Sequence, residues 1–183
     1  GTASGMTDSK VPDGQAGAEK ALNHALVGNA GANMIYESAG MHASLLGFSL
    51  ESLVIDNDII GATQRTIKGI EVTEERLSFE TIKDVCLNGP GHFLGSEQTL
   101  QLMQTEYLYP GVGDRKSPNE WNEQGALDVV QRATAKVEEI LGHNFPSHIA
   151  EAVDAEIRRR FPVKLDRAHM LPSAELAARR RVG

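Results

Sequence analysis

Three groups of polar residues in the sequence have chemistry that suits ligand binding. The first comprises Asp8, Lys10 and Asp13 in the segment TDSKVPD, where a short strand is expected to lead into a helix. Barrel enzymes hold reactive groups on loops in this position, and a solvated loop is an equal alternative. We retain Asp8 as a candidate for orienting the polar end of a ligand.

The second group lies in the segment GANMIYESAGM and comprises Asn33, Tyr36, Glu37 and Met41. A buried strand is expected from Ala32 to Tyr36, which would put an amide, a phenol and a carboxylate at its C-terminal end. These groups suit a cationic ligand through cation–π and charge contacts. The alternative is a capped strand end with Tyr36 in the core.

The third group combines His92, which follows a glycine and a proline in GPGHFLG, with Glu106, Tyr107 and Tyr109. Adjacent residues on a helix point about 100° apart, so Glu106 and Tyr107 cannot both serve one site. The structural alternative for His92 is a loop histidine that binds a backbone carbonyl. A general α/β enzyme with His92 as its base ranks last, because no nucleophile or metal site accompanies it.

Several familiar kinds of site are not indicated by the sequence. It has no phosphate-binding glycine loop with lysine, no HExxH and no paired CxxC, and His143 and His148 are a weak metal pair. We therefore expect no metal site. The single Cys86 cannot form an intrachain disulfide, which favours the reducing cytoplasm. Its apolar neighbours in IKDVCL predict a buried thiol.

Size and charge restrict the class of protein. The 183 residues suit one domain, and 40% hydrophobic with 23% charged residues is typical of a folded globular chain. A formal charge of -7 disfavours nucleic-acid binding, and the arginine triplets 158–160 and 179–181 are interpreted as a solvated helix face and a tail. No apolar run reaches the ~20 residues of a membrane span.

Hydrophobic spacing and capping residues predict a helix-rich α/β fold. Helices are expected at 15–27, 49–68, 78–87, 97–105, 117–141 and 146–161. The second is expected to break at Asp56-Asn57-Asp58, with these residues acting as a cap. Ser96 should cap the fourth, and Ser117 to Glu120 should form a capping box that starts the fifth. The short strands between helices predict βα units, and residues 163–183 a C-terminal tail.

Five ordered segments together resemble the C-terminal part of the trimethylamine methyltransferase family. They are SKVPDGQAGAEK, GANMIYESAGM, LVIDNDIIG, GPGHFLGSEQTL and TEYLYPGVGDRKSPNEW, and the resemblance runs from about residue 5 to 165. It implies that residues 1–162 are the last βα units and terminal helices of a TIM (β/α)8 barrel. Such a barrel needs ~250 residues, so the isolated chain should be incomplete. Its open edges should be covered by helices or by self-association into a homo-oligomer.

The resemblance also implies a reaction. A methyl group would move from a tertiary or quaternary methylated amine, such as trimethylamine or glycine betaine, to the cobalt(I) of a corrinoid (cobalamin) carried by a separate protein. The trimethylamine enzymes carry pyrrolysine, and only standard residues stand here. If the pyrrolysine position falls within this segment, its absence points to the quaternary branch.

The protein would then have to bind a cationic amine, exclude water from it and orient its methyl group toward the cobalt. From residue chemistry and loop position, we assign cation binding to Tyr36 and Glu37. Orientation of polar ends is assigned to Asp8, Asn33 and His92, and no catalytic residue is assigned. The alternative function is a catalytically silent binding or assembly module derived from the same family.

Overall fold

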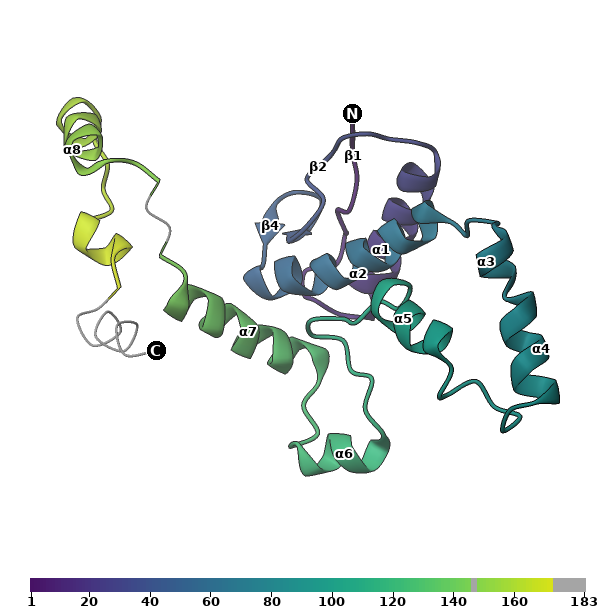
Figure 1. Cartoon of the computed structure of the whole chain (residues 1–183). Helices are drawn as coiled ribbons and strands as arrows, with labels where there is room; N and C mark the ends of the chain where they lie inside the picture. The colour runs from purple at the N-terminus through teal and green to yellow at the C-terminus, as the bar shows by residue number, and fades with distance from the viewer. Residues whose placement is uncertain (146–147, 173–183) are drawn as a thin grey trace.

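The computed structural model describes residues 1–145 and 148–172 of the chain (Figure 1). This part is rich in helix and has few, very short strands, as predicted. In chain order the elements are β1 (Thr2–Ala3), α1 (Gly14–Asn29), β2 (Ile35–Tyr36), β3 (Met41–His42), β4 (Gly47–Phe48), α2 (Leu50–Lys68), α3 (Glu74–Leu77), α4 (Phe79–Leu87), α5 (Glu97–Thr105), α6 (Pro118–Glu123), α7 (Val129–His143), α8 (Glu151–Arg160) and the 3-10 helix η1 (Arg167–Met170).

The strands of the described residues form two small sheets. β1 pairs in parallel with β2, and β3 pairs with β4 as an antiparallel hairpin that the sequence did not predict. The predicted strand 32–36 is therefore shortened to two residues. The parallel pair with α1 between its strands is a βα unit, whereas membership of a TIM barrel stays a prediction.

Helix α2 is the centre of the packed region, with α1 along one side and α7 along another (Figure 1). The face of α1 turned inward has a spacing of four residues, which places one side chain per turn on the same line. It comprises Ala16, Lys20, His24 and Gly28. A Cβ atom added to Gly28 would lie 2.5 Å from Ile67 Cδ1, so a larger residue there would force the end of the Ile67 side chain to move.

The expected break in α2 at Asp56-Asn57-Asp58 is wrong, because the helix is continuous from Leu50 to Lys68. Its cap is Ser49, whose hydroxyl accepts the backbone N–H of Ser52 at 3.1 Å. The two aspartates have tertiary partners instead. Asp56 is buried against α1, and Asp58 accepts N–H groups of the loop before α6. Short polar side chains favour caps locally, but here distant donors satisfy them within the helix.

The predicted helix 117–141 is two helices. Its capping box is confirmed, since Ser117 Oγ and the Glu120 carboxylate each accept the other's backbone N–H. The first helix, α6, ends at Glu123, and the chain then takes left-handed conformations at Gly125 (φ 94°) and Ala126 (φ 51°). A second capping box formed by Asp128 and Gln131 starts α7. The glycine allows the turn, and the second cap fixes a new helix direction.

Other expectations about local structure have mixed outcomes. Helix 97–105 and its Ser96 cap are confirmed, with Ser96 Oγ accepting from Thr99 N at 3.2 Å. The buried thiol was wrong, because Cys86 is exposed and its neighbour Val85 faces inward. A helical spacing leaves one of two adjacent apolar positions outside.

No helix within residues 1–145 and 148–172 has the length and apolar character to cross a bilayer.

The C-terminal region was predicted as a helix 146–161 followed by a tail. α8 begins at Glu151, and residues 146–147 and 173–183 lie outside the described residues, together with the second arginine triplet. Asp154 Oδ2 binds Arg158 Nε at 2.9 Å, as its i,i+4 spacing predicted, and also Arg167 Nη1 at 2.7 Å. The first residues of the predicted tail are therefore attached to α8.

A charged cluster joins the C-terminal end of α2 to α3 and α5. The Glu106 carboxylate binds Arg65 Nη2 at 2.7 Å, Arg76 Nη2 at 3.0 Å and Lys68 Nζ at 3.2 Å. Arg65 Nε also donates to the backbone carbonyl of Glu106 at 3.1 Å. The hydrogen bond from Arg76, followed by that from Lys68, holds the pKa of Glu106 below its usual value.

This lowered pKa predicts an acid-sensitive contribution to stability. Because the folded-state pKa of Glu106 lies below its unfolded value of 4.5, the contribution is complete above pH 4.5 and is lost as the pH falls through the folded pKa. Urea unfolding of the unaltered protein and Glu106→Gln should therefore give midpoints that differ at pH 7 and converge toward pH 3. A constant difference across this range would contradict the prediction.

Candidate functional site

The parallel pairing of β1 and β2 brings the loops that follow them to one edge. Thr2 lies beside Ile35 and Ala3 beside Tyr36, so both strands end at the same level. The loop after β1 carries Asp8, and the loop after β2 begins with Glu37. In open and closed α/β sheets this edge, where parallel strands end, is the usual place for ligand sites.

Backbone and side-chain contacts join the loop after β1 to the β3–β4 hairpin. His42 Nδ1 donates to the carbonyl oxygen of Ser9 at 3.1 Å, and its Nε2 is hydrogen-bonded to the Ser52 hydroxyl at 2.5 Å. Ser44 N donates to the Thr7 carbonyl at 3.1 Å. His42 and Ser52 are buried. The loop after β1 and the hairpin are therefore hydrogen-bonded to each other, and His42 also attaches them to α2.

A cavity of about 350 Å³ opens beside Asp8. Its walls are formed by Met6, Thr7, Asp8, Glu19, Asn23, Ser44 and Leu45. One Asp8 carboxylate oxygen accepts a hydrogen bond from the Ser44 hydroxyl. Two carboxylates and an amide beside the apolar side chains of Met6 and Leu45 are suited to a small organic cation, because apolar groups contact its carbons and carboxylates balance its charge.

Glu19 is the charged member of this cavity that sequence reasoning missed. Its Oε2 accepts from the Thr7 hydroxyl at 2.5 Å and from the Asp8 backbone N–H at 2.9 Å, while Gln15 donates to Oε1 at 2.8 Å. The hydrogen bond from Thr7, then that from Gln15, lowers the pKa of Glu19. Its position in the first half of the helix that follows the Asp8 loop could have identified Glu19 as a candidate from the sequence.

Tyr36 and Glu37 follow β2 at the same edge of the sheet. The Tyr36 side chain is 49% exposed, and Glu37 is exposed with φ 60°. The alternative that Tyr36 belongs to the core is therefore wrong for the described chain. Cation binding by this pair stays a prediction.

Asn33 does not lie at the C-terminal end of the strand, because β2 begins only at Ile35. It lines a different cavity, of about 290 Å³, between α1 and α2, together with His24 and Thr63. The expected amide–phenol–carboxylate arrangement at one strand end is therefore corrected.

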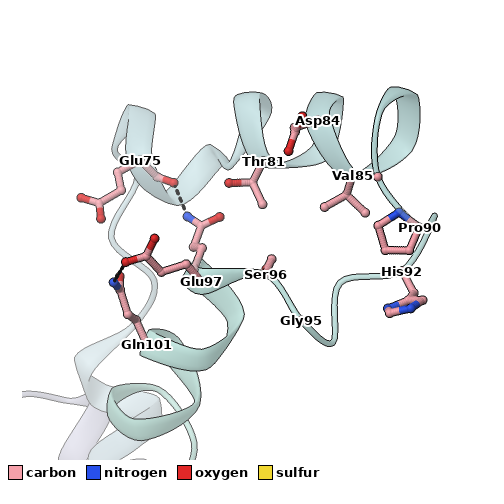
Figure 2. A pocket seen from close by; sticks show the side chains of 12 residues that line it. Glu75, Thr81, Asp84, Val85, Pro90, His92, Gly95, Ser96, Glu97 and Gln101 are labelled. Atoms are coloured by element: carbon pink, nitrogen blue, oxygen red, sulfur yellow. Dashed lines mark hydrogen bonds between the residues drawn. The ribbon is translucent and has the colours of Figure 1, made fainter.

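His92 lies at a third place, in a cavity of about 630 Å³ between α4 and α5. Figure 2 shows His92 beside Pro90 at the opposite end of the cavity from Glu75. The histidine is exposed, and no hydrogen bond of its ring occurs within the described residues, so the structural alternative of a bond to a backbone carbonyl is not found there. Gln98 and Gln101 instead bind the Glu75 carbonyl and the Glu97 carboxylate at 2.7 and 3.1 Å.

The residues grouped with His92 by sequence are used elsewhere. Glu106 binds the basic residues of α2 and α3, and the Tyr109 hydroxyl donates to the Met103 carbonyl at 3.0 Å. The structure therefore places Asp8, Asn33 and His92 in three separate cavities. Across residues 1–145 and 148–172, no group of three or more His, Cys, Asp or Glu side chains could hold a metal ion.

Comparison with known proteins gives the relationship of this chain. A family model described as trimethylamine methyltransferase (MTTB) matches residues 1–165. The trimethylamine methyltransferase MttB1 of Methanosarcina acetivorans is 38% identical over 165 residues, which are 88% of this chain and 31% of that protein. The trimethylamine methyltransferase MttB of Methanosarcina barkeri (strain Fusaro) is 38% identical over 91% of this chain and 32% of its own length.

A relative with a different name extends the comparison. The glycine betaine methyltransferase of Desulfitobacterium hafniense (strain Y51) is 30% identical over 155 residues, 84% of this chain and 32% of that protein. The chain thus spans about a third of the length of the curated relatives that it matches. The family model covers the helices and loops described above as far as α8. The chain therefore belongs to the trimethylamine methyltransferase family.

Proposed function

We propose that this chain is the C-terminal part of a methyltransferase that moves a methyl group from a tertiary or quaternary methylated amine to the cobalt(I) of a corrinoid protein. The observation that carries the proposal is the family match over residues 1–165, with relatives named for trimethylamine and for glycine betaine. Because the chain spans about a third of these relatives, the activity, substrate and partner of the whole protein are proposals.

The described residues suit the amine better than they suit the metal. Carboxylates of Asp8, Glu19 and Glu37 lie on or beside the loops at the strand ends, and carboxylates attract an ammonium group. The proposal leaves the corrinoid on the partner protein, as the family resemblance implies. The corrinoid supplies the cobalt(I) nucleophile, and this chain binds and orients the amine.

The roles of individual residues follow from the type of amine. A quaternary nitrogen can leave without a proton, whereas a tertiary amine must first be protonated or otherwise activated. Charge and aromatic contacts therefore matter more than an acid–base pair for a quaternary substrate. Tyr36 and Glu37 are proposed to bind the cation. Asp8 and Glu19 are proposed to add negative charge at the edge where β1 and β2 end. Asn33 and His92 lie in other cavities and would take part only from there.

The reaction can be tested directly. The protein, and any longer polypeptide that contains it, is mixed with a cob(I)alamin protein and either trimethylamine or glycine betaine. Formation of methylcobalamin is followed by absorbance. We expect conversion that depends on the amine, and no conversion with any tertiary or quaternary amine would overturn the proposed function.

Glu37→Gln is expected to lower kcat/KM of an active protein about fivefold, mainly through KM. The carboxylate attracts substrate and product cations alike, and one such contact at an exposed site contributes up to about 1 kcal/mol. The methylcobalamin assay at varied amine concentration measures the effect. The matched control is Glu97→Gln in the His92 cavity, which should leave KM unchanged.

A catalytically silent assembly module is the second candidate function. It is favoured by large apolar side chains left in solvent, including Leu46 at 91%, Ile70 at 85% and Leu94 at 79% exposure. Exposed apolar side chains in such number are typical of surfaces covered by another protein. Sedimentation at micromolar concentration should then show self-association without turnover. A monomer that converts cob(I)alamin would exclude this alternative.

A further inference from the structure

Glu37 has a backbone conformation that residues with a Cβ atom rarely adopt. Its φ of 60° is left-handed, and the residue is exposed. Its carboxylate forms no hydrogen bond or ion pair within residues 1–145 and 148–172. Such a conformation persists only when the surroundings fix it, and it is found preferentially at functional sites. Neighbouring parts of the loop must therefore hold Glu37 in this conformation.

The residue after Glu37 is held by a buried histidine. His24 Nε2, on α1, donates to the carbonyl oxygen of Ser38 at 2.9 Å, and the Ser38 hydroxyl donates to the Ile35 carbonyl at 2.7 Å. The side chain of His24 is only 2% exposed. Because the ring nitrogen faces a carbonyl acceptor, it must carry the proton. The turn that contains Glu37 is thus closed on itself and attached to α1.

A buried ion pair holds the same loop two residues further on. Asp56 Oδ2 accepts both Lys20 Nζ at 2.6 Å and the backbone N–H of Gly40 at 2.7 Å. Lys20 and Asp56 are 1% and 2% exposed. Gly40 has φ 80°, which residues with a side chain rarely adopt, and a Cβ there would lie 2.4 Å from the Phe48 ring, so glycine fits this point of the loop.

The ion pair is better explained by position than by stability alone. Desolvation offsets much of the attraction between two buried charges, and apolar residues of similar volume often stabilise a fold at least as well. Apolar side chains could not accept the Gly40 N–H, however. The charged pair therefore provides one thing that a hydrophobic contact lacks, which is a fixed anchor for the loop.

We propose that Lys20, Asp56 and His24 are positioning residues that hold the Glu37 carboxylate ready for a methylated ammonium group. This inference rests on the proposed function for the identity of the cation. A quaternary ammonium has no N–H to direct a hydrogen bond, so its attraction to Glu37 depends on distance alone. A loop already held in place avoids the loss of entropy that ordering it on binding would require.

The test uses the full chain and tetramethylammonium chloride as the probe. Lys20→Met/Asp56→Leu replaces the ion pair by an apolar pair, and Arg158→Met/Asp154→Leu is the matched control on α8. NMR reports hydrogen exchange of the Gly40 amide, the HN–Hα coupling of Glu37 and the Kd of the cation. We expect the first variant to stay folded, to exchange the Gly40 amide at least tenfold faster and to bind tetramethylammonium about fivefold more weakly. The same weakening of binding is expected of Glu37→Gln. The control should change neither quantity.

The histidine gives an independent variant should the apolar pair fail to fold. His24→Leu should loosen the Ser38 carbonyl and weaken binding, while His24→Gln, which keeps an N–H donor, should restore both. Three results would each overturn the proposal. The variants could leave Gly40 exchange and the Glu37 coupling unchanged, or they could loosen the loop without changing the affinity for tetramethylammonium. The third is an unaltered chain that does not bind tetramethylammonium. Failure of the proposed function is distinct, because it appears as absent methylcobalamin formation while the loop measurements stand.

Discussion

Lys20→Met alone is expected to lower the free energy of unfolding by about 4 kcal/mol, because it leaves the Asp56 carboxylate buried without its cation. Asp56 is 2% exposed, and its Oδ2 lies 2.6 Å from Lys20 Nζ. The N–H of Gly40 stays as a partner, but one neutral donor does not balance a buried charge. Urea unfolding at pH 7, with the same m-value assumed for both proteins, measures the loss.

The surface supplies the control for this prediction. Lys136→Met removes a lysine whose partner Glu139 is exposed, at an Nζ–Oε2 distance of 2.9 Å. Ion pairs in solvent contribute little, so the change should be under about 0.5 kcal/mol. Equal effects of the two substitutions would show that the Lys20–Asp56 pair is not buried in solution. The double replacement Lys20→Met/Asp56→Leu should recover most of the stability that the single substitution loses.

Asp58→Ala is the second substitution with a large expected effect, about 3 kcal/mol in the free energy of unfolding. The two oxygens of Asp58 accept three successive backbone N–H groups, from Gly111 at 2.7 Å and from Val112 and Gly113 at 2.9 Å. Val112 is 5% exposed, so its N–H would lose its partner in a place that water reaches poorly. The loop joining α5 to α6 would then detach from α2.

Hydrogen exchange distinguishes this mechanism from general loss of structure. In Asp58→Ala, the amides of residues 111–113 should exchange faster than those of α1, whereas Asn57→Ala, an exposed neighbour, should leave both unchanged. Asp58→Asn should have an intermediate effect, because the amide oxygen still accepts without the negative charge. Uniformly faster exchange in Asp58→Ala would contradict a local role for this carboxylate.

Local signals in the sequence determined those parts of the fold that depend on neighbouring residues. The Ser96 cap and the Ser117 capping box were predicted because a side chain reaches a backbone N–H three residues away. The five ordered segments identified the family, since they need no knowledge of contacts. The helix-rich character followed from hydrophobic spacing. The presence of Asp8 on the loop after β1 was likewise a matter of chain order.

Only the tertiary structure decided what the polar residues do. Asp56 and Asp58 have the local sequence of a cap, yet partners that lie 16 to 55 positions away along the chain keep them inside a continuous helix. Asp8 and Ser44 are likewise 36 positions apart, and His42 and Ser9 are 33 positions apart. Spacing along the chain fixes which face of a helix a residue occupies, but a hydrogen bond between remote segments depends on how those segments pack. The packing of α1 on α2 formed the cavity that Asn33 lines, while Asp8 lies in a second cavity beside α1 and His92 in a third between α4 and α5. Glu37 is left exposed at the strand end.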